Sequence, residues 1–233
     1  GLGCFLEVMR MAAAEDGQEV TFDLFPQGDD PARLDTRPVA VARFRAAAAT
    51  PDRLFVQVPA RRTLKEPYDM TRPVPAADLA AILAAAVNGT QAGGTLDPTE
   101  VAFWRTLSHE ALRIEVETPR TYQESVDLFR IGKREVEANP DGIDFSGPLF
   151  EGLALAGLFT RQTVADPAST VYRQGLAAVY ANTDTAMGHL WLVTPDNRRA
   201  TQIAAGRDWV RVNLAATAAG LGIQPLSQCL QEY

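Results

Sequence analysis

The sequence predicts a mixed α+β fold, because segments with helical periodicity alternate along the chain with segments typical of strands. Apolar residues recur at helical spacing in residues 4–15, and apolar and polar side chains alternate in residues 20–25. Hydrophobic residues make up 46% of the 233 residues and charged residues 22%, which excludes wholesale disorder. The interleaving favours α+β or α/β over an all-α fold.

The first expected helix, residues 4–15, has Phe5, Val8 and Met9 on its apolar face, and Gly17 ends it. Four segments follow before residue 60. In order, we expect a strand at residues 20–25, a loop at residues 26–30, an Ala-rich helix at residues 39–49, and either a short strand or a helical turn at residues 54–58.

The clearest helix follows residues 73–75, where Pro-Val-Pro fixes an extended approach. Asp78 lies in its first turn and Asn88-Gly89 ends it. The remaining expected elements are strands at residues 101–106 and 111–117, helices at 122–137 and 171–181, a buried strand at 187–193, a long closing helix within 196–221, and a last short strand at 223–226. Residues 143–159, rich in Gly, Pro and bulky apolar side chains, are interpreted as a lid or a crossover.

Charge and composition exclude several classes of protein. The formal net charge is −7, from 22 Lys+Arg against 29 Asp+Glu, which argues against nucleic-acid binding. No apolar run approaches the roughly 18–20 residues of a membrane span. Cys4 and Cys229 cannot build a disulfide framework or a four-thiolate site, and we predict no metal site.

Residues 3–20 and 206–223 resemble each other when they are aligned at a constant offset of 203. Both copies read as Gly, apolar helix, Ala-Ala, a terminating Gly and an apolar strand. The matched residues are Gly3 with Gly206, Met9 with Val212, Met11 with Leu214, Ala12-Ala13 with Ala215-Ala216, Gly17 with Gly220, and Val20 with Ile223. Chance is the alternative, because Ala-rich helices that end in Gly are common. A duplication would make residues 1–53 the C-terminal part of a first half and residues 54–233 a second half. On this interpretation we expect both ends of the chain to be cut from a longer protein.

The strongest candidate for chemistry is a basic cluster in front of the clearest helix. Arg61 and Arg62 supply forked donors, Thr63 a hydroxyl and Lys65 a point charge within five residues. A phosphate monoester, with several acceptor oxygens, needs such a set. The alternative is a solvated basic loop, although a concentrated positive site is a better anion-site candidate in an acidic chain.

A second cluster, residues 220–228, reads Gly-Leu-Gly-Ile-Gln-Pro-Leu-Ser-Gln. Glycines and a proline at a helix-to-strand junction allow the backbone to approach a flat ligand, and Ser227 and Gln228 add donors and acceptors. The Gly-x-Gly is not a dinucleotide fingerprint, because it ends a helix and does not open one. An ordinary helix cap and turn is the alternative.

Other residues give weaker signals. His109 and His189 lack metal-ligand spacing and are interpreted as surface or satisfied core histidines. Neither Ser146 nor Ser227 lies in a Gly-x-Ser-x-Gly motif, so the sequence gives no nucleophile that would support an α/β-hydrolase. The remaining candidates are Trp104, Trp191 and Trp209, read as packing residues of which one could lie against a planar ligand, and Asp29, Asp30, Asp141 and Asp144, which lack calcium-loop spacing.

Taken in order, residues 59–68, 72–75, 205–209, 213–218 and 220–228 resemble the FMN-dependent nitroreductase family. The likeness is closer to its Acg-like branch, in which one chain contains two nitroreductase-like halves, and it spans most of the chain. It implies a nitroreductase-like α+β sheet flanked by helices, pseudo-duplicated, with one half incomplete here.

The resemblance also implies a cofactor, FMN, and the residues that hold it. The flavin phosphate falls on Arg61, Arg62, Thr63 and Lys65. The backbone that faces the isoalloxazine falls on Pro225, Leu226, Ser227 and Gln228. The implied function is an oxidoreductase whose flavin accepts hydride from NAD(P)H and passes it to a nitroaromatic or quinone-type acceptor; no catalytic acid or base is named, because the cofactor carries the chemistry.

Three departures from the family pattern leave a second reading open. Lys65 replaces the more usual Arg, a Pro-Ser-x-x-Asn-x-Gln-Pro-Trp segment is absent, and no basic tail follows residue 228. The alternative is a non-catalytic protein that sequesters FMN beneath a lid, with residues 143–159 as that lid. The sequence leaves open a homodimer, and a location either in the cytoplasm or exported through a signal ahead of residue 1.

Overall fold

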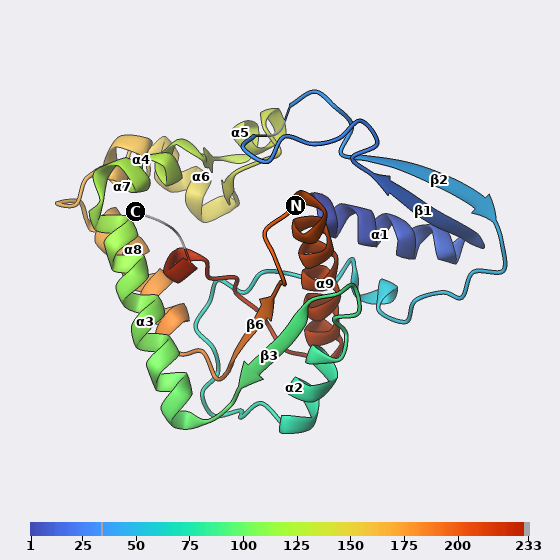
Figure 1. Ribbon diagram of the computed structural model, residues 1–233. Helices are drawn as coiled ribbons and strands as arrows, with labels where there is room; N and C mark the ends of the chain where they lie inside the picture. Colours follow the sequence, from blue (N-terminus) through green and yellow to red (C-terminus); the bar gives the residue numbers. More distant parts are fainter. Residues whose placement is uncertain (34, 231–233) are drawn as a thin grey trace. The chain divides into compact units, whose positions relative to one another are not determined.

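The computed structural model describes residues 1–33 and 35–230 (Figure 1). It is mixed α+β, as the sequence predicts, with two-stranded sheets set among helices in the part that is described. The chain forms two compact units. The first unit contains Gly1–Leu64, Pro73–Asp97 and Gly188–Pro225, and the second contains Lys65–Arg72, Pro98–Met187 and the described residues from Leu226 onward.

The first unit contains two antiparallel strand pairs, β1 with β2 and β3 with β6 (Figure 1). Its elements are helix α1 (Leu2–Glu15), strands β1 (Gln18–Leu24) and β2 (Ala40–Ala46), the 3-10 helix η1 (Phe55–Gln57), helix α2 (Ala76–Leu83), strands β3 (Gln91–Thr95) and β6 (His189–Val193), and helix α9 (Arg199–Ala218). The predicted helices at residues 4–15 and within 196–221, and the predicted strand at 20–25, are therefore confirmed. The open choice at residues 54–58 is resolved as a helical turn.

Helices α1 and α9 cross with their backbones in contact. A Cβ atom added to Gly3 would lie 2.2 Å from the Ile203 carbonyl oxygen and 2.8 Å from the Cα of Gly206, so no side chain fits at the crossing. The Cys4 thiol donates a hydrogen bond to the Gly206 carbonyl at 3.2 Å. The two glycines that the offset of 203 aligns therefore meet face to face.

A buried cluster lies along this helix pair. Met11 and Leu214, which the same offset aligns, are both fully buried and share the cluster with Leu54 and Val210. The duplication itself stays a prediction. The two compact units are a different division of the chain, because residues 1–53 and α9 both belong to the first unit.

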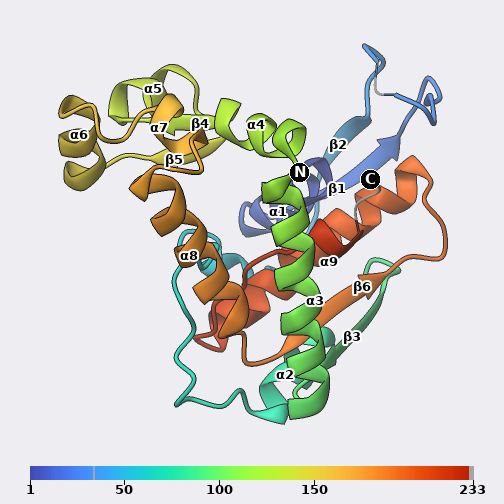
Figure 2. The same cartoon turned by 90° about the vertical axis from the view of Figure 1, so that its left-hand side faces the viewer.

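The second unit is mainly helical, with a small body gathered around two short parallel strands (Figure 2). Its elements are helix α3 (Pro98–Glu117), helix α4 (Pro119–Asp127), strand β4 (Phe129–Ile131), helix α5 (Lys133–Ala138), strand β5 (Ile143–Phe145), helices α6 (Pro148–Leu155), α7 (Arg161–Ala165) and α8 (Thr170–Asp184), and the 3-10 helix η2 (Gln228–Leu230). The predicted helix at residues 171–181 is confirmed as α8.

Residues 143–159 form part of the core of this small body. Phe145, Phe150 and Phe159 are close to one another at ring-centroid distances of 5.1–5.3 Å, and Phe129 adds a further edge contact at 4.8 Å. Val126 and Val164, both almost fully buried, complete the cluster. The segment is thus β5, α6 and their packing side chains, and its aromatic residues are committed to the unit's own interior.

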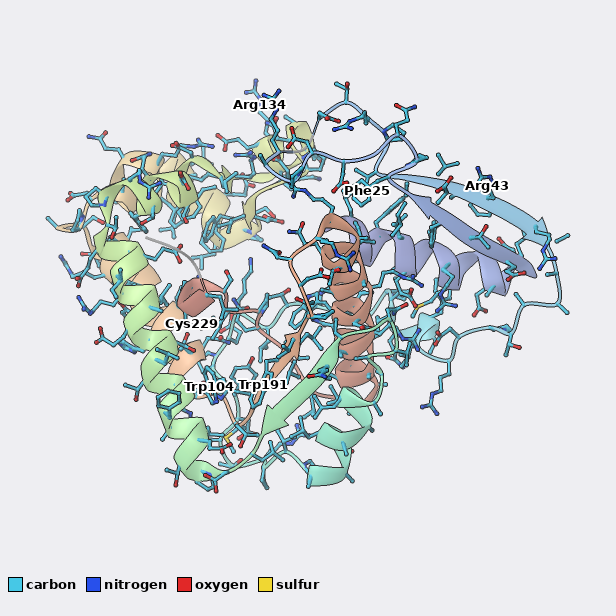
Figure 3. All side chains as sticks on the ribbon, in the orientation of Figure 1. Phe25, Arg43, Trp104, Arg134, Trp191 and Cys229 are labelled. Atoms are coloured by element: carbon cyan, nitrogen blue, oxygen red, sulfur yellow. The ribbon has the colours of Figure 1, made fainter. Side chains whose placement is uncertain are left out.

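The predicted helix at residues 39–49 is wrong, because most of it forms β2. Alanine has a high helix propensity, but antiparallel pairing with β1 places Phe44 opposite Val20 on the apolar face. Arg43 lies on the other face, projects outward (Figure 3) and approaches Asp23 of β1 at 3.6 Å. Tertiary pairing therefore overrides local propensity here.

The predicted strands at residues 101–106 and 111–117 are also wrong, since both belong to the single helix α3. Its buried residues include Val101, Ser108 and Leu112, which are spaced by seven and four positions and so share one helical face. The short period-2 alternation in residues 111–117 is therefore incidental.

Two further predictions are corrected in part. Residues 122–137 were expected as one helix but form α4, β4 and α5, interrupted by Gly132 at a φ of +83°. Residues 223–226 were expected as a strand but form only an isolated bridge at Ile223. The strand at residues 187–193 is confirmed as β6, although its residues are half-buried or exposed and not deeply buried.

The Gly3 crossing can be tested by one methyl group. We expect Gly3→Ala to lower the free energy of unfolding by about 3 kcal/mol, because the added Cβ overlaps backbone that cannot move without separating the helices. Gly175→Ala is the matched control: Gly175 lies inside α8 with nothing within 4 Å of an added Cβ, so this change should stabilise by about 0.5–1 kcal/mol. Urea unfolding measures both, and a neutral Gly3→Ala would contradict the backbone contact.

Candidate functional site

The structure joins part of the basic cluster to the segment that follows the closing helix. Thr63 and Ile223 form a parallel β-bridge, and the Leu64 amide donates a hydrogen bond to the Ile223 carbonyl at 3.1 Å. These residues lie 160 positions apart in the sequence, since 223 − 63 = 160, and both belong to the first unit. The segment interpreted as a phosphate site and the segment interpreted as an approach to a flat ligand therefore lie side by side.

Glycine permits this approach. A Cβ atom at Gly222 would lie 2.9 Å from the Leu64 side chain, closer than packed atoms allow. Just upstream, α9 ends in a Schellman motif: the Leu221 amide donates to the Ala216 carbonyl at 2.9 Å and the Gly220 amide to the Thr217 carbonyl at 3.0 Å. The terminating Gly220 has the expected positive φ of +70° and turns the chain toward the basic segment.

The basic segment begins from the helical turn η1. The Arg61 amide donates to the Gln57 carbonyl at 2.9 Å, which continues the turn beyond its last residue. The Arg62 guanidinium donates to the Pro59 and Arg61 carbonyls at 2.8 and 2.7 Å. These bonds fold the segment back on itself and hold one face of the Arg62 side chain.

The positive charge of this segment is not neutralised within the described part of the chain. Among the residues that the structure describes, neither Arg61 nor Arg62 forms an ion pair with a carboxylate, whereas Arg10, Arg207 and Arg211 all do. Arg62 and Thr63 are exposed and Arg61 is half-buried. The segment therefore presents forked donors to the solvent in a chain of net charge −7.

The remaining predicted residues divide between the two units. Pro225 is exposed and lies in the first unit, whereas Lys65, Leu226, Ser227 and Gln228 belong to the second. Lys65 is exposed and makes no ion pair with any described carboxylate. The Ser227 amide donates to Gln228 Oε1 at 3.2 Å, and the Ser227 carbonyl accepts from the Leu230 amide at 2.8 Å within η2. Thr63 is thus paired with the segment that follows α9, whereas Lys65, Leu226, Ser227 and Gln228 belong to the other unit.

A buried ion cluster, which sequence analysis missed, supports η1. The Glu7 carboxylate is 1% exposed and lies 2.7 Å from Arg10, 2.8 Å from Arg207 and 3.0 Å from Arg211. Asp52 joins it, 2.6 Å from Arg211, and its other oxygen accepts a hydrogen bond from the Leu54 amide at 3.1 Å. That last bond begins the turn from which the basic segment extends.

The ion cluster keeps both carboxylates charged. Burial alone would raise the pKa of Glu7, but hydrogen bonds from Arg10 and Arg207 outweigh it and hold that pKa below its ordinary value. The pKa of Asp52 is lowered in the same way, with burial opposed by the hydrogen bond from Arg211. The apolar face expected on α1 is wrong for this reason: Phe5 is 61% exposed, and Glu7 occupies the buried face.

A second buried carboxylate orders the turn between α2 and β3. Asp208 of α9 is fully buried and accepts hydrogen bonds from the Val87, Asn88 and Thr90 amides at 2.7–3.1 Å. Burial would raise the pKa of Asp208, but these bonds and the Thr90 hydroxyl lower it. A lone Asp within an apolar helix was the only sequence signal for this role.

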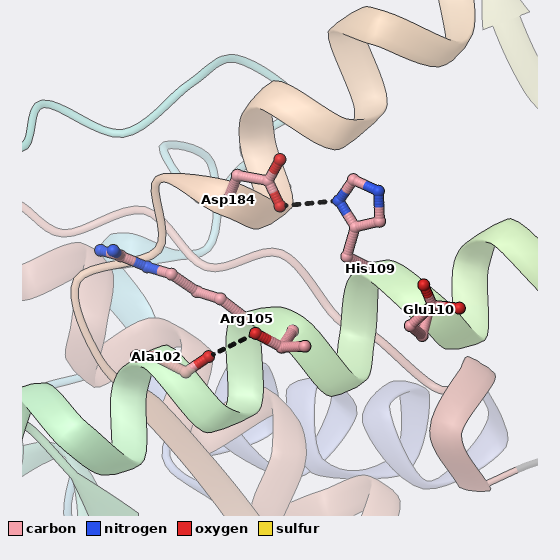
Figure 4. A pocket seen from close by; sticks show the side chains of 6 residues that line it. Ala102, Arg105, His109, Glu110 and Asp184 are labelled. Atoms are coloured by element: carbon pink, nitrogen blue, oxygen red, sulfur yellow. Dashed lines mark hydrogen bonds and ion pairs between the residues drawn. The ribbon is translucent and has the colours of Figure 1, made fainter.

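The second unit contains a shallow cavity of about 350 Å³ between α3 and the end of α8 (Figure 4). His109 Nδ1 lies 2.9 Å from Asp184 Oδ1, and the ring stacks on Tyr180 at 4.0 Å. Arg105 Nε donates to the Ala186 carbonyl at 2.8 Å. The histidine, interpreted from sequence as a surface or core residue, is half-buried and links two helices. His189 is half-buried on β6.

No family model matches the chain, and a search of curated proteins finds no match. Within the described residues, no group of three His, Cys, Asp or Glu side chains could hold a metal ion, and no helix is long and apolar enough to cross a membrane. The resemblance to nitroreductases stays a prediction, and the geometry above is the basis for a proposal.

The ion cluster can be tested through its dependence on pH. We expect Glu7→Gln to lower the free energy of unfolding at neutral pH by about 3 kcal/mol, because three arginines then face a neutral amide. The folded-state pKa of Glu7 lies below its ordinary 4.5, so its stabilisation is complete above that pH and is lost as the pH falls through the folded-state pKa. The variant should therefore lose less stability than the wild type between about pH 5 and about pH 3.

Urea unfolding across this pH range measures both effects. Glu15→Gln is the control, since Glu15 is an exposed residue of the same helix that forms no ion pair within the described chain. It should keep the stability and the pH slope of the wild type. A Glu7→Gln protein with unchanged stability and slope would show that the cluster is not formed.

Proposed function

We propose that the chain binds FMN and is a nitroreductase-like oxidoreductase, with NAD(P)H as hydride donor and a small nitroaromatic or quinone as acceptor. The observation that carries the proposal is the Thr63–Ile223 bridge. It makes neighbours of a segment suited to a phosphate and a Gly/Pro segment suited to a flat ring, and this adjacency is what a phosphorylated flavin requires.

The donor set fits the phosphate of FMN. A phosphate monoester carries close to two negative charges and accepts several hydrogen bonds, which forked guanidinium groups satisfy best. Arg61 and Arg62 have no carboxylate partner among the described residues, so a phosphate would not have to displace one. Thr63 adds an exposed hydroxyl beside them in the first unit.

The close approach at Gly222 suits the isoalloxazine ring, the planar part of FMN. The Leu64 side chain packs directly on the backbone of Gly222, and the Leu64 amide donates a hydrogen bond to the Ile223 carbonyl, so the two backbones are held together next to Thr63. A fixed backbone offers amide and carbonyl groups to a planar ligand without prior ordering. We place the ring beside residues 223–225 on this basis.

The roles of the chain's residues in this proposal are binding and orientation. Bound FMN would supply hydride transfer, and the protein would hold the phosphate and present one face of the ring. Arg61 and Arg62 would neutralise the charge of the phosphate, and Thr63 would donate a hydrogen bond to it. Pro225 limits the movement of the adjoining backbone. We assign no proton transfer to a side chain.

Binding assays with FMN and with riboflavin, which lacks the phosphate, test the proposal. We expect saturable FMN binding by the wild type and a yellow protein after reconstitution. Arg61→Ala and Arg62→Ala should each weaken FMN binding about ten-fold, the effect of losing one charge-assisted contact, and should leave riboflavin binding unchanged. Arg53→Ala is the matched control, because Arg53 is an exposed arginine nearby that lies outside the cluster.

Two results would contradict the proposal. One is wild-type protein that binds no FMN; the other is an Arg61→Ala, Arg62→Ala double variant that binds FMN as the wild type does. A steady-state assay of NAD(P)H oxidation with a quinone then separates an enzyme from a protein that sequesters the flavin, because bound FMN without turnover supports sequestration.

A further inference from the structure

The turn between α2 and β3 contains the pair Asn88-Gly89, in which spontaneous deamidation is chemically easy because glycine has no side chain to shield its backbone nitrogen. In this reaction the backbone nitrogen of the glycine attacks the side-chain carbonyl carbon of the asparagine. A new C–N bond closes a succinimide ring, and the side-chain nitrogen leaves as ammonia with the proton of the attacking amide. Water then opens the ring to aspartate or isoaspartate, so the chain and water supply every atom.

The attacking group is accessible in the structure. Gly89 is exposed, its φ is +105°, and an added Cβ atom would meet nothing within 4 Å. Among the residues that the structure describes, the Gly89 amide donates to no acceptor, whereas the amides of Asn88 and Thr90 on either side both donate to Asp208. The nucleophile is therefore free, and the rate of the reaction depends on how the asparagine is held.

Asp208 of α9 holds the reacting side chain. Its Oδ1 accepts a hydrogen bond from the Asn88 side-chain amide at 2.9 Å and another from the Asn88 backbone amide at 2.7 Å. The first bond restrains rotation of the carboxamide, and the second fixes the backbone that carries it. Because Nδ2 is the leaving group, deamidation requires this nitrogen to give up its bond to a buried carboxylate.

Burial and charge suit Asp208 to this role. The residue is fully buried, and its Oδ2 accepts hydrogen bonds from the Thr90 amide at 3.1 Å and the Thr90 hydroxyl at 2.7 Å. Although burial opposes ionisation, these bonds and those from Asn88 lower the pKa of Asp208. An ionised carboxylate accepts strongly from the carboxamide and offers no proton to departing ammonia.

We propose that Asn88-Gly89 is a deamidation site that Asp208 holds inert in the folded chain, so that Asn88 is converted only when the α2–β3 turn opens. All of the residues involved belong to the first unit. The inference is independent of the proposed flavin, because it concerns the chemistry of the chain itself.

Conversion has a structural consequence. An aspartate at position 88 sets a second carboxylate against the buried Asp208, which is unfavourable without a cation between them. Isoaspartate instead lengthens the main chain by one carbon, just before the Thr90 amide that donates to Asp208 and before β3 begins at Gln91. Either product prevents the turn from closing as before.

Mass spectrometry of peptides from the full-length chain tests the site. We expect deamidation of Asn88 at neutral pH to be at least about ten-fold slower in the folded chain than in urea, where the turn is open. Asn197 is the control within the same samples, since it is exposed but is followed by the bulky Arg198. It should stay unmodified under both conditions.

Substitutions test the role of Asp208. Asp208→Asn replaces the carboxylate, and Thr90→Val removes only the bond from the Thr90 hydroxyl. We expect Thr90→Val to speed deamidation and hydrogen exchange of the Asn88 amide by the same factor, about five-fold, the effect of one hydrogen bond. Asp208→Asn should speed both further, and circular dichroism shows whether it is folded; the Thr90→Val comparison stands without it.

Thr217→Val is the matched control for these variants. Thr217 also lies in the first unit, and its hydroxyl bonds only to the Asn213 carbonyl of its own helix, at 2.9 Å, among the bonds described. Both rates should equal those of the wild type. Asn88→Asp, which mimics one product, should be less stable to urea than Asn88→Ala, because only the first adds a negative charge beside Asp208.

Three results would overturn the proposal. The first is a folded wild-type chain that deamidates at Asn88 as fast as the chain in urea. The second is an Asn88 that stays intact in urea. The third is a Thr90→Val chain in which exchange of the Asn88 amide becomes faster and deamidation does not, because conversion then does not follow opening of the turn. Equal stability of Asn88→Asp and Asn88→Ala would overturn the structural consequence.

Discussion

Three arginines converge on one carboxylate that is almost entirely withdrawn from water, and the first unit is arranged around that contact. Removing a charge from water costs several kcal/mol, so Glu7 is tolerated only where Arg10, Arg207 and Arg211 supply close, oriented donors. That requires α1 and α9 to lie closer than ordinary side chains permit. Gly3 and Gly206 make this approach available, one turn away from Glu7 on the same helix face.

The effect of the ion cluster reaches the candidate site through the backbone. Asp52 shares Arg211 with Glu7 and starts the turn η1, η1 leads into the basic segment, and Thr63 then pairs with Ile223. Arg211 also donates to the carbonyl of Ala85, just after the end of α2, at 2.9 Å. One side chain on α9 thus fixes three separate stretches of the first unit, and Asp208 of the same helix fixes a fourth, the turn before β3.

Sequence reasoning located those features that depend on local physics. Gly17 and Gly220 end helices at positive φ, and α2, α8 and α9 lie where apolar spacing predicts helices, although α2 ends at Leu83 and not at Asn88-Gly89. Sequence reasoning failed where tertiary contacts determine the secondary structure. Most of residues 39–49 forms a strand because β1 pairs with it. Helix α3 was predicted as two strands because the hydrophobic period was read over segments too short to show a helix. Glu7 and Asp208 were passed over because a charged residue in a helix ordinarily indicates the solvated face.

The candidate site shows the same division. The clustering of Arg61, Arg62 and Thr63 was visible in the sequence as a candidate phosphate site, but the bridge that joins Thr63 to Ile223 was not predicted. In the second unit, the bonds from Asn182 to the Glu66 carbonyl and from the Tyr68 amide to Thr185 were not visible, because Asn182 and Thr185 carry no pattern that distinguishes them from other polar helix residues. Only the fold reveals which backbone they hold.

The α1–α9 crossing also has a consequence for the order in which the chain folds. The two helices are separated by about 200 residues, since Gly3 meets Gly206, so the core of the first unit has a high contact order and closes late. The aromatic body built from α4 to α8 is contiguous and can close on its own. During synthesis α1 and the β1–β2 hairpin therefore lack their partner α9 until it emerges from the ribosome, and in that interval Leu6 and Met11 are without the contacts that α9 provides.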